Sequence, residues 1–306
     1  MSLLEELRGA GLERPATDVG LAGRIRDQLE AAAAGVPAGV TVRVTKRRLH
    51  QVLLCEAHLV ALLTAAPPPS PEQVAGQLLD WLFGLVATGQ PVGTDLVADA
   101  LGAGAASGES DLARDWDSLS VEAQGEARMI VAACWPALVA WPQLPPSALV
   151  RLQEPIVAEL AGGRVVLAGR ADLVLGQPGA GRAGSRLIDL KSGRHRQEDV
   201  AEAGWYAVLE TLRHRAAPLQ VGTYYLRDGF LALDVVTAEL LEQASGRIAE
   251  GVRRLVALAG GAEAEANPNP LCPWCPKIDS CEPGRRLASE RGTYVPRMNL
   301  EASDEL

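Results

Sequence analysis

The chain has 306 residues, of which 48% are hydrophobic, 22% charged and only 4% aromatic, and its formal net charge at pH 7 is −9. This composition supplies enough apolar side chains for a core and excludes a mainly disordered chain. The acidic balance argues against a generic nucleic-acid coat protein, but it leaves room for an enzyme whose cations are locally grouped.

The first residues of the chain do not resemble a signal peptide, because Glu5, Glu6 and Arg8 stand where an apolar stretch is needed. The longest apolar run, residues 129–142, is too short to span a membrane. We therefore expect a cytoplasmic protein with no membrane partner.

Helices are expected to dominate the first half of the chain. Residues 1–40 are predicted to form a helical extension, with a helix over 21–34, and residues 41–145 a helical region. Apolar spacing predicts helices over 45–63, 72–88 and 120–139 in that region. The segment 102–108, rich in Gly, Ala and Ser, is expected to be a flexible connection.

After residue 146 the sequence pattern changes from helical to strand-like. Short segments rich in β-branched residues predict strands over 149–156, 165–175 and 186–190. A helix over 198–213, a hairpin of 219–226 with 230–235 and a long helix over 237–259 are expected to follow. Residues 146–260 are thus predicted to be an α/β core, and residues 261–306 a loop-like tail rich in cysteine.

Two carboxylates and an amine are expected to meet at one edge of this core. Asp172 lies on one predicted strand, and Asp189 and Lys191 lie on the next. Side chains at i and i+2 of a strand point the same way, so Asp189 and Lys191 project together. Such a group can hold a divalent metal ion and orient a water for attack on a phosphate. Glu154, on the preceding strand, is a candidate third carboxylate.

The scarcity of lysine supports a special role for Lys191. The chain has 26 arginines and only three lysines, which are Lys46, Lys191 and Lys277. A compact ammonium group is a better point charge beside a water molecule than the planar fork of arginine. The plainer interpretation, a pair of surface strands with ordinary charges, applies when Asp-x-Lys stands alone.

Together these motifs resemble the PD-(D/E)XK nuclease superfamily, in its RecB-like exonuclease branch, over about residues 41–285. The resemblance implies a restriction-endonuclease-like core with a central mixed β-sheet flanked by helices. It also implies Mg²⁺ or Mn²⁺ held by Asp172 and Asp189, a catalytic Lys191, and Glu154 as the acidic residue of the preceding motif.

Two positions depart from the pattern of that family. Its Gln-x-x-x-Tyr motif on the following helix is matched at Tyr206, which would contact DNA, whereas Glu202 replaces the amide. Many relatives also carry a metal-binding histidine in an early helix, and here Asp80 takes its place. Asp80 is then either a metal ligand or a solvated helix charge.

Cysteine spacing indicates a second metal site. Cys272, Cys275 and Cys281 form a CxxC-x₅-C motif. In a chain without a secretion signal, metal binding is a better interpretation than disulfides, and three thiolates need a fourth ligand. The resemblance to iron–sulfur nucleases of the AddB and CRISPR-associated exonuclease type implies that Cys55 completes a 4Fe–4S cluster. Zn²⁺, with His58 as the alternative ligand, is the other possibility. Cys134 is expected to be a buried core thiol.

A positive track for DNA is expected from Arg47 and Arg48, which precede Cys55, and from Arg194 and Arg196, which follow the Asp-x-Lys strand. The expected function is a divalent-metal-dependent DNA exonuclease for single-stranded ends or flaps, with a structural 4Fe–4S cluster, in DNA repair or recombination. The chain lacks a P-loop, so a helicase or CRISPR-associated protein is the expected partner class. The alternative is a catalytically weak iron–sulfur DNA-binding subunit of a larger helicase–nuclease or CRISPR adaptation complex.

Overall fold

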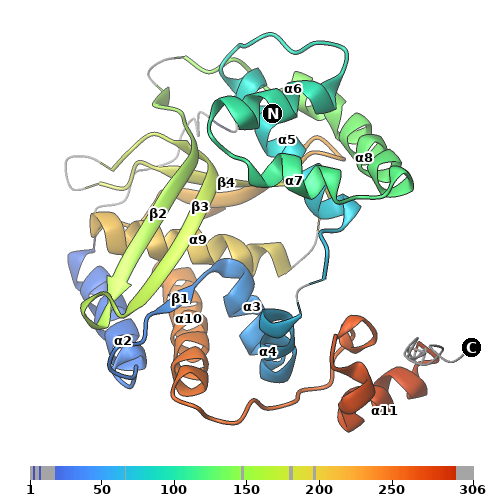
Figure 1. Ribbon diagram of the computed structural model, residues 1–306. Helices are drawn as coiled ribbons and strands as arrows, with labels where there is room; N and C mark the ends of the chain where they lie inside the picture. Colours follow the sequence, from blue (N-terminus) through green and yellow to red (C-terminus); the bar gives the residue numbers. More distant parts are fainter. Residues whose placement is uncertain are drawn as a thin grey trace, which may run out of the picture.

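The computed structural model describes Leu3, Leu7 and residues 18–65, 67–145, 148–178, 182–195 and 198–293. In this part of the chain a six-stranded sheet lies between two layers of helices (Figure 1). The strands are β1 (Val42–Val44), β2 (Arg151–Leu160), β3 (Val165–Leu175), β4 (Arg186–Lys191), β5 (Gln220–Tyr225) and β6 (Phe230–Val235). The helices are α2 (Val19–Ala33), α3 (Lys46–Leu54), α4 (Glu56–Thr64), α5 (Pro71–Ala87), α6 (Leu96–Ala106), α7 (Asp111–Asp117), α8 (Val121–Val139), α9 (Glu198–His214), α10 (Ala238–Ala259) and α11 (Glu282–Glu290).

The sheet is mixed. Its hydrogen-bonded order is β1-β3-β4-β5-β6, with β2 also paired to β3. The β1–β3 and β4–β5 pairs are parallel, whereas β2–β3, β3–β4 and β5–β6 are antiparallel. The parallel β4–β5 pair requires a crossover, and α9 supplies it. The expectation of an α/β core with a mixed sheet flanked by helices is therefore confirmed.

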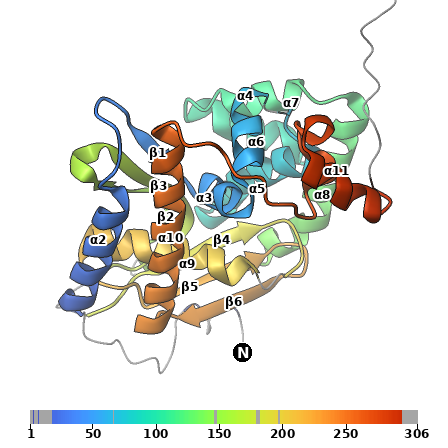
Figure 2. The same cartoon turned by 90° about the horizontal axis from the view of Figure 1, so that it is seen from below.

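Each face of the sheet has its own hydrophobic core. Helices α2, α3, α9 and α10 pack on one face, around buried residues that include Leu187 of β4 and Trp205 of α9. Helices α5 to α8 pack on the other face, against Ile188 and Leu190 of β4. Figure 2 shows α2 and α10 side by side, beneath which α9 crosses the strands. The alternation of Leu187 with Ile188 thus places the odd-numbered residues of β4 on the α9 side.

Most element predictions agree with the structure, and three are wrong. The helix expected over 45–63 is divided at Cys55, whose extended backbone (φ −167°, ψ 114°) separates α3 from α4. The segment 102–108 is not a flexible connection, because α6 continues to Ala106. The tail is not simply loop-like, since 3₁₀ turns at Cys272–Trp274 and Ile278–Ser280 lead into α11. None of the helices in the described residues is both long enough and apolar enough to cross a membrane.

Candidate active site

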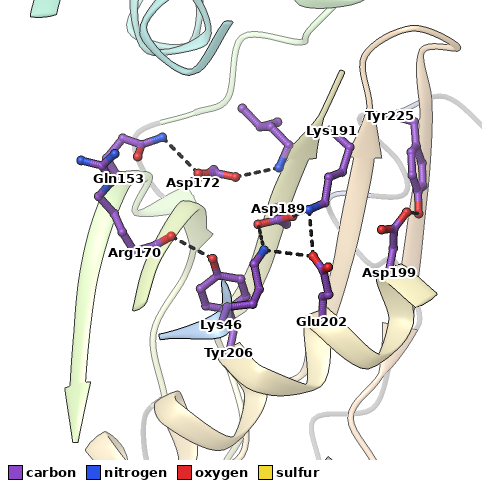
Figure 3. Close-up of polar contacts among 11 residues, drawn as sticks. Lys46, Gln153, Arg170, Asp172, Asp189, Lys191, Asp199, Glu202, Tyr206 and Tyr225 are labelled. Atoms are coloured by element: carbon purple, nitrogen blue, oxygen red, sulfur yellow. Dashed lines mark hydrogen bonds and ion pairs between the residues drawn. The ribbon is translucent and has the colours of Figure 1, made fainter. Parts of the chain in front are cut away.

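Strand β4 presents two of the predicted residues side by side. Lys191 Nζ lies 3.1 Å from Asp189 Oδ2, which places both side chains on the α9 face of the sheet (Figure 3). Asp172, on the neighbouring strand β3, accepts a hydrogen bond from the backbone N–H of Leu190 at 2.8 Å. Strand pairing therefore brings Asp172, Asp189 and Lys191 together, as the spacing of these residues predicts.

Two further residues complete a compact group of opposite charges. Glu202, on α9, accepts a hydrogen bond from Lys191 Nζ at 2.8 Å. Lys46, the first residue of α3, lies 3.0 Å from Asp189 Oδ1 and 3.3 Å from Glu202 Oε2. Each of these two carboxylates thus contacts both ammonium groups. The sequence interpretation did not place Lys46 in the site, although its status as one of only three lysines was a usable signal.

Opposite charges at close range keep this group ionised. Burial alone would lower the pKa of Lys46 and of Lys191, but Asp189 and Glu202 outweigh it and raise both pKa values above the usual range. Burial would likewise raise the pKa of Asp189 and Glu202, yet the two ammonium groups lower it. At neutral pH Lys191 is therefore a cation that donates hydrogen bonds and cannot accept a proton.

The carboxylates farther from the lysines behave differently. Burial, followed by the charge of Asp189, raises the pKa of Asp172 to about 7. Burial, followed by the charges of Asp172 and Asp189, raises the pKa of Asp80, on α5, well above its ordinary value. Asp80 lines the same cleft as Asp172 and Asp189. Burial and neighbouring carboxylates thus disfavour the ionised form of Asp80 and of Asp172, whereas the two lysines stabilise that of Asp189.

Glu154 is not part of this group. Its carboxylate lies 2.8 Å from Arg213 Nη1, near the C-terminal end of α9. Arg213 is about 16 Å along the helix axis from Glu202, at 1.5 Å per residue. Its neighbour Gln153 lies beside Asp172 instead, because Gln153 Nε2 donates to Asp172 Oδ1 at 3.2 Å. Gln153 has a positive φ of 49°, which is uncommon for a residue other than glycine and could not be predicted from the sequence.

The oxygen donors present fit a hard divalent cation. Asp80, Asp172 and Asp189 repel one another, and the buried Oε1 of Gln153 has no hydrogen-bond partner in the described part of the structure. Mg²⁺ and Mn²⁺ prefer such carboxylate and amide oxygens. As the described side chains stand, no three Asp, Glu, His or Cys groups are close enough to share one ion. The ammonium group of Lys46 supplies the positive charge beside Asp189.

The group lies in a cleft with a volume of about 1180 Å³. One wall comes from α3, α4 and α5, and the other from β3, β4 and the start of α9. Of the residues predicted to bind DNA, Arg47, Arg48 and Arg194 line this cleft, whereas Arg196 lies outside the described residues. Tyr206 also lines it, but its hydroxyl donates to the carbonyl oxygen of Arg170 at 3.0 Å, and its ring lies 5.0 Å from Lys46 Nζ. Three of the four arginines predicted to bind DNA thus line the same cleft as the carboxylates.

A second cavity, of about 430 Å³, is lined by four cysteines. Two of their sulfur atoms already accept backbone hydrogen bonds, Cys55 from Asn267 at 3.4 Å and Cys272 from Asn269 at 3.3 Å. A Cβ atom at Gly284 would lie 3.2 Å from the sulfur of Cys281, so only glycine fits comfortably there. The four cysteines predicted to bind a cluster are Cys55, Cys272, Cys275 and Cys281, and all of them line this cavity.

The cysteine cavity lies where the α3–α4 junction meets the segment that follows α10. The N–H of Ala57 donates to the carbonyl oxygen of Glu265 at 3.0 Å, and Asn267 Nδ2 donates to the carbonyl oxygen of Leu54 at 3.0 Å. The break between α3 and α4 therefore turns Cys55 toward the tail. Soft sulfur donors in one cavity fit an iron–sulfur cluster or Zn²⁺, and His58 lines the same cavity. Cys134 lies apart, fully buried in α8, as expected of a core thiol.

The comparison with protein families agrees with this geometry. A family model described as the PD-(D/E)XK nuclease superfamily matches residues 45–282. No curated protein matches the sequence. A solved structure from Eubacterium rectale, described as a "putative exonuclease", is similar with a TM-score of 0.47 and 11% sequence identity, over 80% of this chain and 87% of that one.

Proposed function

Since the chain belongs to the PD-(D/E)XK nuclease superfamily, we propose that it is a divalent-metal-dependent DNA exonuclease acting on single-stranded ends or flaps. The observation that carries this proposal is the convergence of Asp80, Asp172, Asp189 and Lys191 in one cleft. The arginines that line this cleft supply the positive charge that a phosphate backbone requires.

In this proposal Asp80, Asp172 and Asp189 hold Mg²⁺ or Mn²⁺. The bound ion would lower the pKa of a water molecule and neutralise charge on the phosphate. Lys191 keeps its proton, because Asp189 and Glu202 stabilise the ammonium form. It therefore acts as a fixed donor that orients the attacking water and stabilises the negative charge that develops. Glu202 restrains the ammonium group from α9, so that its position does not depend on the substrate.

The shape of the cleft supports a single strand as substrate. Residues of α3, α4 and α5, such as Gln51 and Gln73, line the cleft together with the carboxylates of the sheet. A flexible single strand can pass between these walls and place one phosphate against Asp189. We place the reaction in DNA repair or recombination. A helicase or CRISPR-associated protein would supply the motor, because the sequence has no P-loop of its own.

We further propose that Cys55, Cys272, Cys275 and Cys281 hold a structural 4Fe–4S cluster. The hydrogen bonds from backbone N–H groups to sulfur support it, because such donors stabilise thiolates. Four sulfur donors suit the cluster better than Zn²⁺ bound with His58, which is the alternative. Anaerobically purified protein should be brown and contain iron and sulfide. A colourless protein with one equivalent of zinc would leave the nuclease proposal intact and refute the cluster.

Cleavage of labelled oligonucleotides tests the proposed activity. We expect purified protein to degrade single strands in Mg²⁺ or Mn²⁺ and to be inactive in EDTA or as Asp189→Asn. Oligonucleotides blocked at the 5′ or the 3′ end give the polarity, and a circular single strand should resist. A protein that binds single strands but cuts none of these substrates would instead be the alternative, a catalytically weak DNA-binding subunit.

A further inference from the structure

Tyr225, Phe230 and His195, here called the aromatic step, form a group of rings beside Lys191 at the end of the sheet. Lys191 on β4 is paired with Tyr225 on β5, and Tyr225 is paired with Phe230 on β6. Directly paired residues point to the same face of a sheet. The three side chains therefore form one row across the end of the sheet, with Phe230 roughly 10 Å from Lys191, two strand spacings of about 4.8 Å each.

The three rings of the aromatic step contact one another. Phe230 and Tyr225 are nearly parallel, at 16° and 6.2 Å between ring centroids. The ring of His195 meets both edge-on, at 5.1 Å from Tyr225 and 6.2 Å from Phe230. Tyr225 is anchored from below, because its hydroxyl donates to Asp199 at 2.8 Å. The buried ring thus holds the outer one in a fixed orientation.

Phe230 is nevertheless 52% exposed, in a chain with only two phenylalanines. Positive charge is close to it along the chain, since Arg227 precedes it by three residues and Arg194 adjoins His195. Both arginines line the cleft, whereas Phe230 lies outside the cleft lining. An exposed aromatic ring beside cations is the combination by which proteins bind unpaired nucleotides, with the base on the ring and the phosphate on the cation.

We propose that Phe230, oriented by Tyr225 and His195, stacks against an unpaired base of the substrate strand next to the nucleotide being cut. This inference rests on the proposed function and adds to it a residue that selects unpaired DNA. A base within a duplex is already stacked and paired, so it must leave its partner to reach the ring. Phe230 is in this view a specificity-determining residue that acts on binding.

The test measures binding of single-stranded and blunt duplex oligonucleotides by fluorescence anisotropy, without added divalent metal so that no cleavage occurs. Phe230→Leu keeps apolar bulk over Tyr225 but lacks an aromatic face, whereas Phe230→Trp keeps the face. We expect Phe230→Leu to bind the single strand about tenfold or more weakly, and Phe230→Trp to bind like the parent. Val235→Ala is the matched control, since Val235 is 45% exposed on the same strand. It should bind as the parent does.

Salt dependence separates stacking from phosphate contact. Phe230→Leu should leave the slope of log K against log salt unchanged, whereas Arg227→Ala should reduce it by about 0.7. Equal single-strand affinity for Phe230→Leu and the parent, or a slope that falls with Phe230→Leu, would overturn the aromatic step while leaving the nuclease in place. Tight, Phe230-dependent binding without cleavage of any DNA would support the aromatic step and refute the nuclease. A parent protein that binds no single strand would overturn both.

Discussion

Replacing Lys46 with methionine should strengthen binding of Mn²⁺ or Mg²⁺. In the structure the Lys46 ammonium group lies 3.0 Å from Asp189, a proposed ligand, and a cation that binds there must displace it. A hydrogen bond between charged groups contributes about 1.5–3 kcal/mol, and about 1.4 kcal/mol corresponds to a factor of ten. Methionine has similar length and no charge, so we expect Lys46→Met to bind the metal ion about tenfold to a hundredfold more tightly.

Isothermal titration with Mn²⁺ in the absence of DNA measures this affinity directly. Arg47→Met is the matched control, because Arg47 is the next residue of α3 and lines the same cleft. Its affinity should change by less than about twofold, since exposed charges are screened by solvent. Weaker or unchanged binding by Lys46→Met would refute the reasoning, because Lys46 would then not compete with the ion for Asp189.

Three further predictions concern the other parts of the two sites. Lys191→Arg should keep DNA and metal binding but lose roughly a hundredfold in the rate of cleavage, since a planar guanidinium cannot replace the ammonium beside the water; parental single-turnover rates would exclude that role. Glu154→Gln should cleave at the parental rate. Gln153→Leu removes the hydrogen bond to Asp172 and should weaken metal binding about tenfold in titrations. A loss of metal binding in Glu154→Gln but not in Gln153→Leu would show that Glu154 acts in the site. Gly284→Ala should lower both the iron content and the melting temperature, because its Cβ would press on the cysteine sulfur atoms; full iron content would contradict the proposed cluster seat.

The sequence predicts the parts of the site that follow from a local period. Asp189 and Lys191 point the same way because they are two residues apart on a strand, and Asp172 follows from the pairing of that strand with the one before it. Lys46 meets Asp189 across 143 residues, through packing of α3 against the sheet, and no local pattern encodes such a contact. Gln153, and not Glu154, contacts Asp172, and the left-handed backbone of Gln153 at this point of the strand is not visible in the sequence.

The same contrast holds for the helices. Regular apolar spacing predicts α5 and α8 nearly to the residue, because their buried faces follow the helical repeat. The division of the helix expected over 45–63 is not visible in that spacing, since apolar residues continue on both sides of Cys55. Hydrogen bonds to the tail, more than 200 residues away, compensate for the interrupted helix at this position.

Helix α3 connects the carboxylate cleft with the cysteine cavity. It begins with Lys46 at Asp189, ends immediately before Cys55, and is nine residues or about 14 Å long. The helix rests tightly on α10, where a side chain larger than hydrogen at Gly251 would collide with Leu49. This close contact fixes the position of α3 on α10. The ammonium group beside Asp189 and the first cysteine of the cavity thus adjoin one short helix, and a substitution that displaces α3 from α10 would disturb both places together.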